Sequence, residues 1–268
     1  MSRNFELLQN IGKEQEYFQA GDVLSEPVTV PLAQPQAEPG TAFTAAALPA
    51  GTDTSQCSTE SSQLTELAKL VQRVFLLPGN ESHRTVVFTS SDSGNGCSWI
   101  CARVGELLAS QVTGSVCLVD ANLHSPTLHQ QFGVSNHHGL SDALRLSGSI
   151  RGYATQVSRR NLALVSCGSE QKEAQGLVSS DRMRVRLHEL RSEFDYVLVD
   201  CPSMDVGNEA ISLGAVADGI ILVLKANTTR KERARGAVQE LQNAKVRILG
   251  AVLNQRTFPI PDAIYKKL

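Results

Sequence analysis

The sequence predicts an α/β protein built on a doubly wound, mostly parallel sheet, and two observations support that prediction. First, short runs rich in Val, Ile and Leu recur from about residue 85 onward without alternating polar residues, as in strands that are covered on both faces. Second, stretches with the apolar spacing of amphipathic helices separate these runs. Such alternation is typical of parallel sheets with helices on both faces. Ligands of these sheets bind beyond the carboxyl ends of the strands, so the loops there are the candidate sites.

The individual elements follow from local pattern. Apolar runs predict strands at residues 85–89 (TVVFT), 116–119 (VCLV), 162–166 (LALVS), 196–199 (YVLV), 219–224 (GIILVL) and 248–253 (ILGAVL). Helical spacing of apolar residues predicts helices at residues 98–110, 179–193, 208–217 and 229–243. Four arginines are expected on the exposed face of the second of these helices, with a phosphate-binding patch as the alternative: Arg182, Arg184, Arg186 and Arg191.

The N-terminal part of the chain differs in composition from the rest. A short amphipathic helix is predicted over residues 1–20 by four apolar residues near helical spacing, namely Phe5, Leu8, Ile11 and Phe18. Residues 21–62 hold five of the ten prolines and neither Lys nor Arg. Such a stretch buries too little apolar surface to offset its ordering entropy, so we expect a flexible, disordered linker. Residues 63–268 are expected to form the α/β domain.

Charge and cysteine content exclude several classes of protein. With 25 Lys and Arg against 27 Asp and Glu in 268 residues, the chain offers no basic surface for nucleic acid or an anionic membrane. No apolar run reaches the roughly 18 residues that span a bilayer, and the N-terminus lacks a signal-peptide core. Six cysteines in a chain of this length do not make a disulfide framework. We therefore expect a soluble, cytoplasmic protein.

The loop after the first predicted strand is the strongest candidate binding site. It reads SSDSGNGCSW over residues 90–99 and leads directly into a helix. Backbone N–H groups of a glycine-rich turn at a helix N-terminus converge on a phosphate, and the helix dipole favours negative charge there. For the loop taken alone, an ordinary strand-to-helix turn is the alternative. The residues expected to bind a nucleotide are Ser93, Gly94, Asn95, Gly96, Cys97, Ser98 and Trp99.

The loop lacks one residue type that phosphate chemistry requires. A working phosphate loop carries a Lys before its Ser or Thr, where it reaches the β- and γ-phosphates while the hydroxyl holds Mg²⁺. Ser98 supplies the hydroxyl, but Cys97 occupies the place of the Lys. The loop therefore departs from the Walker pattern at its charged position.

Two aspartates at strand ends complete the predicted site. Asp120 ends the second predicted strand and Asp200 ends the fourth. A carboxylate in this position beside a phosphate loop is where P-loop enzymes hold Mg²⁺, whereas a turn or a helix cap is the alternative. We expect ATP or ADP as cofactor, with Mg²⁺ held by Ser98, Asp120 and Asp200. In an active protein the two aspartates would be the catalytic residues.

Longer motifs resemble a known family. The segment PTLHQQFGVSNHHGLSDAL at 126–144 is similar to the family's PxLHxxFG…GLSDxL, and FDYVLVDCP at 194–202 fits its Walker B strand. Together with the loop at 90–99 and DANLHSP at 120–126, they resemble the cytoplasmic domain of bacterial tyrosine kinases of capsule and exopolysaccharide systems. That family belongs to the deviant-Walker group that includes the MinD and ParA ATPases. For residues 63–268 the resemblance implies a P-loop NTPase-like fold, autophosphorylation on tyrosine, and a membrane polysaccharide co-polymerase as partner.

The departures from the family pattern fall on chemistry. Four substitutions lie at or near the predicted site: Cys97 for Lys, Trp99 for Thr, Asn122 for Asp and His124 for Arg. The family's E-x-x-R-x-x-R oligomerisation helix is partly kept as Glu66, Lys69 and Gln72, so a homo-oligomer is an expectation. The C-terminal tyrosine cluster is reduced to Tyr265, which is the candidate phosphoacceptor or else an anchor for the C-terminus.

These departures lead to one leading function and two alternatives. The first is a regulator of exopolysaccharide biosynthesis with impaired kinase activity, recruited by its partner to the inner face of the membrane. Loss of one charge-stabilising donor typically costs about 10²–10³ in rate. The second is an active autokinase with a substitute cation, and the third is a MinD/ParA-like positioning ATPase. Cys97 itself is expected to be inert, with a reactive thiol at the helix N-terminus as the alternative.

Overall fold

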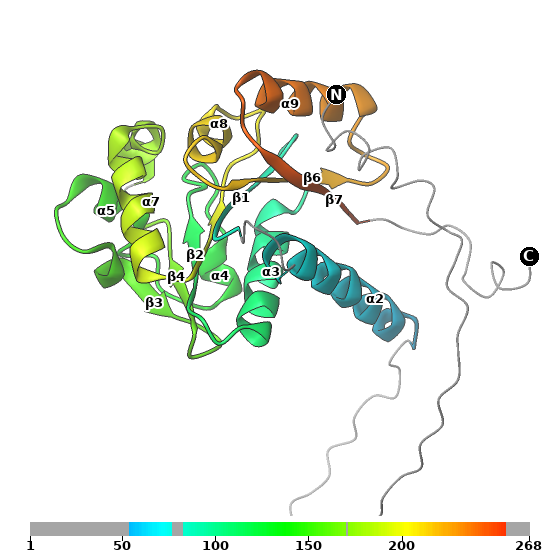
Figure 1. Cartoon of the computed structure of the whole chain (residues 1–268), viewed down its shortest axis with the longest axis horizontal. Coiled ribbons are helices and arrows are strands. Elements are labelled where there is room, and N and C mark those ends of the chain that lie inside the picture. The colour runs from blue at the N-terminus through cyan, green and yellow to red at the C-terminus, as the bar shows by residue number, and fades with distance from the viewer. Residues whose placement is uncertain (1–53, 77–82, 170, 256–268) are drawn as a thin grey trace, which may run out of the picture. The chain divides into compact units, whose positions relative to one another are not determined.

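The computed structural model describes three stretches of the chain, residues 54–76, 83–169 and 171–255 (Figure 1). The chain divides into two compact units, residues 1–57 and 58–268, and the second contains the sheet. The predicted helix at residues 1–20, most of the predicted linker, and Tyr265 lie outside the described residues.

The centre of the second unit is a seven-stranded sheet in the order β3-β4-β2-β5-β1-β6-β7. Its strands are β1 (Thr85–Ser90), β2 (Val116–Asp120), β3 (Ala154–Gln156), β4 (Leu162–Val165), β5 (Tyr196–Asp200), β6 (Gly219–Lys225) and β7 (Ile248–Asn254). Neighbouring strands pair in parallel except β3, which is antiparallel to β4. The six predicted strands are confirmed. The seventh, β3, was not predicted because its three residues, ATQ, form no apolar run.

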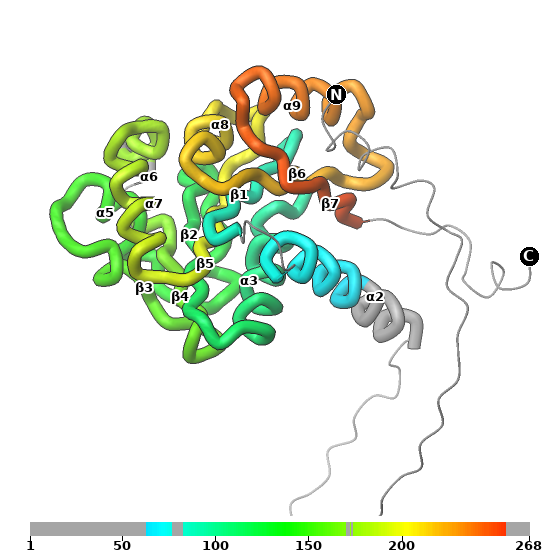
Figure 2. Tube along the Cα trace, in the orientation of Figure 1, coloured from blue at the N-terminus to red at the C-terminus, as the bar shows by residue number. Residues whose placement is uncertain are grey.

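Helices cover both faces of the sheet, which confirms the doubly wound arrangement (Figures 1 and 2). The sheet separates two hydrophobic cores. In β1, Val87 packs in the first core, whereas Val86 and Phe88 pack in the second. The first core also takes side chains from α5 (Leu140–Arg145), α7 (Asp181–Glu193), α8 (Glu209–Gly214) and α9 (Lys231–Asn243). The second takes them from α2 (Thr54–Val71), α3 (Cys97–Gln111) and α4 (Leu128–Gln131).

The four predicted helices correspond to α3, α7, α8 and α9. Short helical segments at Gln72–Leu76, Ile150–Tyr153, Gln171–Ala174 and Gln175–Leu177 complete the described fold. Helix α2 begins at Thr54, within the stretch predicted as linker, so that boundary lies too late in the chain. The last proline of the predicted linker is Pro49, and nothing after it breaks the helix that buries Leu67 and Val71.

One predicted surface residue is buried. Arg186 of α7 is only 8% exposed, and its guanidinium donates to the carbonyl oxygens of Ala143 (2.8 Å), Leu146 (2.7 Å) and Gly148 (2.6 Å). The prediction of an exposed arginine face is therefore wrong at this position. The reason is that the C-terminus of α5 leaves carbonyl groups without helical partners, and the long side chain of Arg186 satisfies them.

Within the described residues, no helix combines the length and the apolar character needed to cross a membrane.

Candidate functional site

The predicted site residues converge because three adjacent strands end at one edge of the sheet. Strand β5 lies between β2 and β1, and Asp120 is the register partner of Asp200. The loop that leaves β1 begins after Ser90 and leads into α3 at Cys97. The loop and both carboxylates therefore meet at the carboxyl edge, where α/β sheets bind ligands.

Two glycines give the loop its shape. Gly94 and Gly96 have φ angles of 78° and 82°, in the left-handed region that favours glycine. A Cβ at Gly94 would meet nothing within 4 Å, so the backbone there borders open space. A Cβ at Gly96 would collide with the side chain of Asn254, which donates to the carbonyl oxygen of Asn95 at 2.9 Å. The loop thus packs against the end of β7 on one side and stays open on the other.

Asn95 braces the loop through its side chain. The residue is buried, and its amide donates to the hydroxyl oxygens of Ser91 (3.3 Å) and Thr229 (3.4 Å). Its contribution to a phosphate cradle would therefore come from the backbone. Sequence reasoning identified the residue but not this role.

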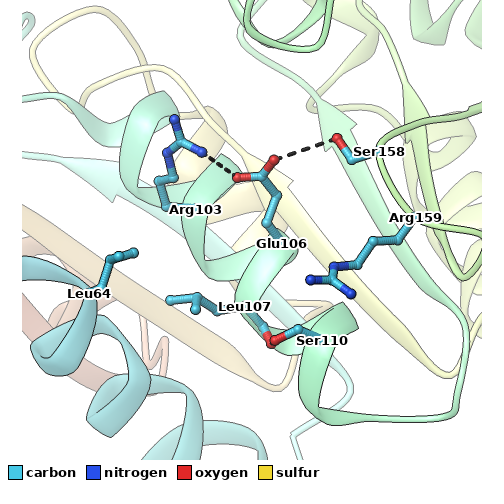
Figure 3. Close-up of a pocket in the computed structure, with 7 residues that line it drawn as sticks. All are labelled: Leu64, Arg103, Glu106, Leu107, Ser110, Ser158 and Arg159. Carbon is cyan, nitrogen blue, oxygen red and sulfur yellow. Dashed lines mark hydrogen bonds and ion pairs between the residues drawn. The ribbon is translucent and has the colours of Figure 1, made fainter. Parts of the chain in front are cut away.

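The side chain of Trp99 lies on the surface of α3. Its ring is 5.7 Å from the guanidinium carbon of Arg103, one helical turn further on. A groove beside α3 is shown in Figure 3, lined by Leu64, Arg103, Glu106, Leu107, Ser110, Ser158 and Arg159. No predicted nucleotide-binding residue lines this groove, so it is separate from the loop.

The two buried aspartates differ in their hydrogen bonding. Asp120 accepts the backbone N–H groups of Asn122 (3.3 Å) and Leu128 (3.2 Å), but burial raises its pKa to about 7. Neither carboxylate oxygen of Asp200 accepts a well-formed hydrogen bond from the described residues, although Ser98 and Cys97 lie close to it. Burial and the neighbouring Asp120 raise the pKa of Asp200 well above its ordinary value, while Ser98 and Cys97 beside it lower it. Burial therefore disfavours the charged form of both carboxyl groups.

Cys97 is the first residue of α3. It is buried, and burial, followed by the charge of Asp200, raises its pKa well above the usual value. Burial also raises the pKa values of Cys101 and Cys201. Desolvation therefore opposes the alternative of a reactive thiolate, which a helix N-terminus would favour.

The oxygen donors at this edge fit Mg²⁺. Asp200 offers two unpartnered oxygens beside the hydroxyl of Ser98, and Asp120 lies on the next strand. Among the described residues no three His, Cys, Asp or Glu side chains form a complete metal site. Mg²⁺ sites usually combine one or two carboxylates with water and phosphate oxygens.

Two further contacts on the loop were not predicted. Arg233 of α9 donates from Nε to Asp92 at 3.0 Å, and Asp205 accepts from the backbone N–H of Ser93 at 3.4 Å. These contacts link residues 141 and 112 positions apart, so local pattern gives no signal for them.

The positions of two family departures have local explanations. Asn122 accepts the backbone N–H of Ser125 at 3.1 Å and so forms part of the turn after β2. His124 lies 3.1 Å from Glu209, the first residue of α8. Both substitutions therefore make structural contacts at the edge of the site.

Comparison with known proteins identifies the fold and the family, although no family model matches the chain. The kinase domain of the Escherichia coli tyrosine kinase ETK has a TM-score of 0.61 at 22% identity, covering 68% of this chain and 73% of that one. A ParA family ATPase from Chlorobium tepidum has a TM-score of 0.53 at 23% identity, with 65% and 74% covered. These two likenesses establish the fold.

Sequence relatives carry the assignment further. The succinoglycan biosynthesis transport protein ExoP of Rhizobium meliloti is 27% identical over 183 residues, 67% of this chain but only 23% of ExoP. The tyrosine-protein kinase YwqD of Bacillus subtilis is 32% identical over 171 residues, 64% of this chain and 72% of YwqD. With that identity over most of a kinase's length, the chain belongs to the bacterial tyrosine-protein kinase family.

Proposed function

We propose that this protein is a kinase-like regulator of exopolysaccharide biosynthesis that binds a nucleotide but transfers phosphate poorly. The observation that supports it is Cys97, a buried neutral thiol at the position where the family has its phosphate-binding Lys. The carboxylate beside it, Asp200, accepts no well-formed hydrogen bond from the described residues. The glycine-rich loop that would bind the phosphates is kept, but the positive charge of the family's Lys is missing at position 97.

The chain's own groups would divide the binding task. Backbone N–H groups from Gly94 to Ser98 would cradle the phosphates at the N-terminus of α3. The Ser98 hydroxyl, Asp200 and Asp120 would hold Mg²⁺, which when bound supplies charge neutralisation of the phosphates. Because both aspartates have raised pKa values, Mg²⁺ would compete with protons for the pair.

The missing Lys is expected to affect catalysis more than binding. Phosphoryl transfer depends on positioning and on stabilising charge on the transferred group. Removing one such donor costs on the order of 10²–10³ in rate, whereas backbone N–H groups continue to bind phosphate. Weak autophosphorylation of Tyr265 is therefore part of the proposal.

We further propose a membrane polysaccharide co-polymerase as partner, which would recruit the protein to the inner face of the membrane. The aligned part of this chain corresponds to 23% of ExoP, so the partner would supply what the remainder of that longer protein contains. A homo-oligomer through the helix with Glu66 and Lys69 stays a prediction. These two side chains form an exposed ion pair with each other at 2.7 Å.

An active autokinase is the second candidate, and Arg233 is the observation that favours it. Its guanidinium contacts Asp92 of the loop at 3.0 Å, and its side chain is 58% exposed. A cation so placed could turn toward a bound phosphate. Loss of ATP turnover in Arg233→Ala but not in Arg235→Ala, which alters the same helix, would support this candidate.

The experiment that tests the proposal is calorimetric titration of ADP and ATP, with Mg²⁺, into wild type, Cys97→Lys and Cys97→Ser. We expect Cys97→Lys to bind at least tenfold more tightly than the size control Cys97→Ser, because it restores one charge near the phosphates. Autophosphorylation is then measured with Tyr265→Phe as control. Absence of nucleotide binding to Cys97→Lys, folded by circular dichroism, would contradict the proposal, and rapid turnover by wild type would favour the autokinase.

A further inference from the structure

The segment after β5 is held along the end of β1. The backbone N–H of Cys201 donates to the carbonyl oxygen of Phe88 at 2.9 Å, and that of Met204 donates to Ser90 at 2.9 Å. Between them, the hydroxyl of Thr89 donates to the carbonyl oxygen of Pro202 at 2.8 Å. These bonds follow β1 to the point where the phosphate loop begins. The next residue, Asp205, therefore lies at the start of that loop.

The carboxylate of Asp205 occupies a small anion-binding position on the loop. It accepts the backbone N–H of Ser93 at 3.4 Å and the hydroxyl of Ser93 at 3.3 Å. The hydroxyl of Ser203 lies 2.9 Å from that of Ser93 and completes the set of donors. Burial raises the pKa of Asp205, but hydrogen bonds from Ser203 and Ser93 outweigh it and hold the pKa below the usual value. The donor groups of the loop thus already bind an anion, the carboxylate of Asp205.

Asp205 contacts the phosphate loop from the segment that follows β5, whose last residue is Asp200. In P-loop proteins the loop N–H groups cradle the inner phosphates, and a metal on the Ser hydroxyl bridges the β- and γ-oxygens. The γ-phosphate lies toward the aspartate at the end of the neighbouring strand. In this chain that aspartate is Asp200, and Asp205 follows it on the same segment.

The charge of Asp205 is not compensated by the described residues. Asp92, which belongs to the loop itself, is paired with Arg233, whereas no described ion pair reaches Asp205. The third phosphate of a triphosphate would find the donor groups of Ser93 already bound to Asp205 and would be repelled by the Asp205 carboxylate. A diphosphate ends one phosphate earlier and would avoid both effects.

On the basis of the proposed nucleotide site, we propose that Asp205 is a specificity-determining residue that competes with the terminal phosphate and makes the loop prefer a nucleoside diphosphate to a triphosphate. The side chain is exposed, so it can be displaced without unfolding the segment. Displacement costs the hydrogen bonds to Ser93 and brings like charges together.

The test compares the dissociation constants of ADP and of the non-hydrolysable triphosphate AMP-PNP, each with Mg²⁺, by calorimetry. Wild type, Asp205→Asn and Asp205→Ala are compared in both the native and the Cys97→Lys backgrounds. Glu240→Gln, which removes an exposed carboxylate near the far end of α9, controls for net charge. At a separation of about 4 Å the repulsion removed corresponds to roughly a three- to tenfold gain in affinity for AMP-PNP.

The expected result is that both Asp205 variants tighten AMP-PNP by this factor while ADP changes less than about twofold, and Glu240→Gln changes neither. An unchanged ratio of the two constants, or equal tightening of both nucleotides, would overturn the role of Asp205 and leave nucleotide binding intact. Absence of binding in every variant, including those with Cys97→Lys, would overturn the nucleotide site as well. The two failures are therefore distinct.

Discussion

Asp195 and Asp200 lie just before the first residue and at the last residue of β5, and their surroundings are opposite. Asp195 accepts the backbone N–H of Ser115 at 2.8 Å and its hydroxyl at 2.9 Å. These hydrogen bonds, then the Arg84 charge, hold the pKa of Asp195 below its usual value against a small effect of burial. Asp200 is fully buried, accepts no well-formed hydrogen bond from the described residues, and has a raised pKa.

The same contrast extends to other strands of the sheet. At the amino edge, Asp218 accepts the backbone N–H groups of Arg84 and Thr85, both at 2.7 Å, and pairs with Arg191 at 3.0 Å. At the carboxyl edge, Asp120 has two weaker backbone bonds and no described ion pair. Buried polar groups in proteins are normally satisfied, so the proposed ligand site depends above all on the carboxylate of Asp200, which is not satisfied by the described residues.

The largest expected effect tests the carboxyl edge of the sheet, where no described ion pair reaches Asp120 or Asp200. Asp200→Asn should raise the free energy of unfolding by about 1–4 kcal/mol at pH 8, because the amide keeps the shape and requires neither a buried charge nor proton uptake on folding. A carboxyl group whose pKa is raised on folding stabilises fully below its unfolded pKa of about 4, and that stabilisation is lost as pH rises. For Asp120 the loss extends to about pH 7. The gain of Asp200→Asn should therefore grow from pH 4 upward.

Urea denaturation of the full chain between pH 4 and 8 measures this, with Glu240→Gln as the charge control. A variant less stable than wild type at pH 8 would mean that a cation compensates Asp200. That result would remove the contrast between the two edges.

The next effect tests the amino edge of the sheet, where Asp218 pairs with Arg191. Asp218→Ala should lower the free energy of unfolding by about 1–3 kcal/mol, because two backbone N–H groups lose their acceptor and Arg191 loses its partner. Asp218→Asn keeps an acceptor oxygen and should recover part of the loss. Equal stability of Asp218→Ala and wild type would show that water replaces the carboxylate without cost, and the amino edge would no longer count as paired.

The features of this comparison that the sequence predicts are those that depend on local pattern. Continuous apolar runs predicted β2 and β5, and the position of Asp120 and Asp200 at their ends predicted that the two carboxyl groups meet. Parallel strands bring their carboxyl ends together whatever the intervening chain does, so this inference needed no knowledge of packing.

The rest depends on burial and on distant contacts. The sequence left two interpretations of Cys97 open, an inert thiol and a thiol with a lowered pKa at a helix N-terminus. Burial in the core raises the pKa, and depth of burial is not a local property. Arg186 has the sequence context of a surface residue and yet is buried against the end of α5. Asp205 reaches Ser93 only because β5 and β1 are neighbours, which strand order decides.

The smallest expected effect has the opposite dependence on pH and so separates the two edges. Asp195 has a lowered pKa, and its stabilisation is present above the unfolded pKa of about 4 and lost as pH falls below it. Asp195→Asn should therefore be slightly less stable than wild type at pH 7 and equal to it near pH 2. The difference should shrink in 1 M salt, since the side chain is exposed and its interaction with Arg84 is screened. Parallel urea denaturation of Asp195→Asn and Asp200→Asn across the same pH range should give stability differences of opposite sign at neutral pH. Differences of the same sign would mean that a negative charge has the same effect on stability at both ends of β5. The difference between the two edges would then no longer support a ligand site at the carboxyl edge.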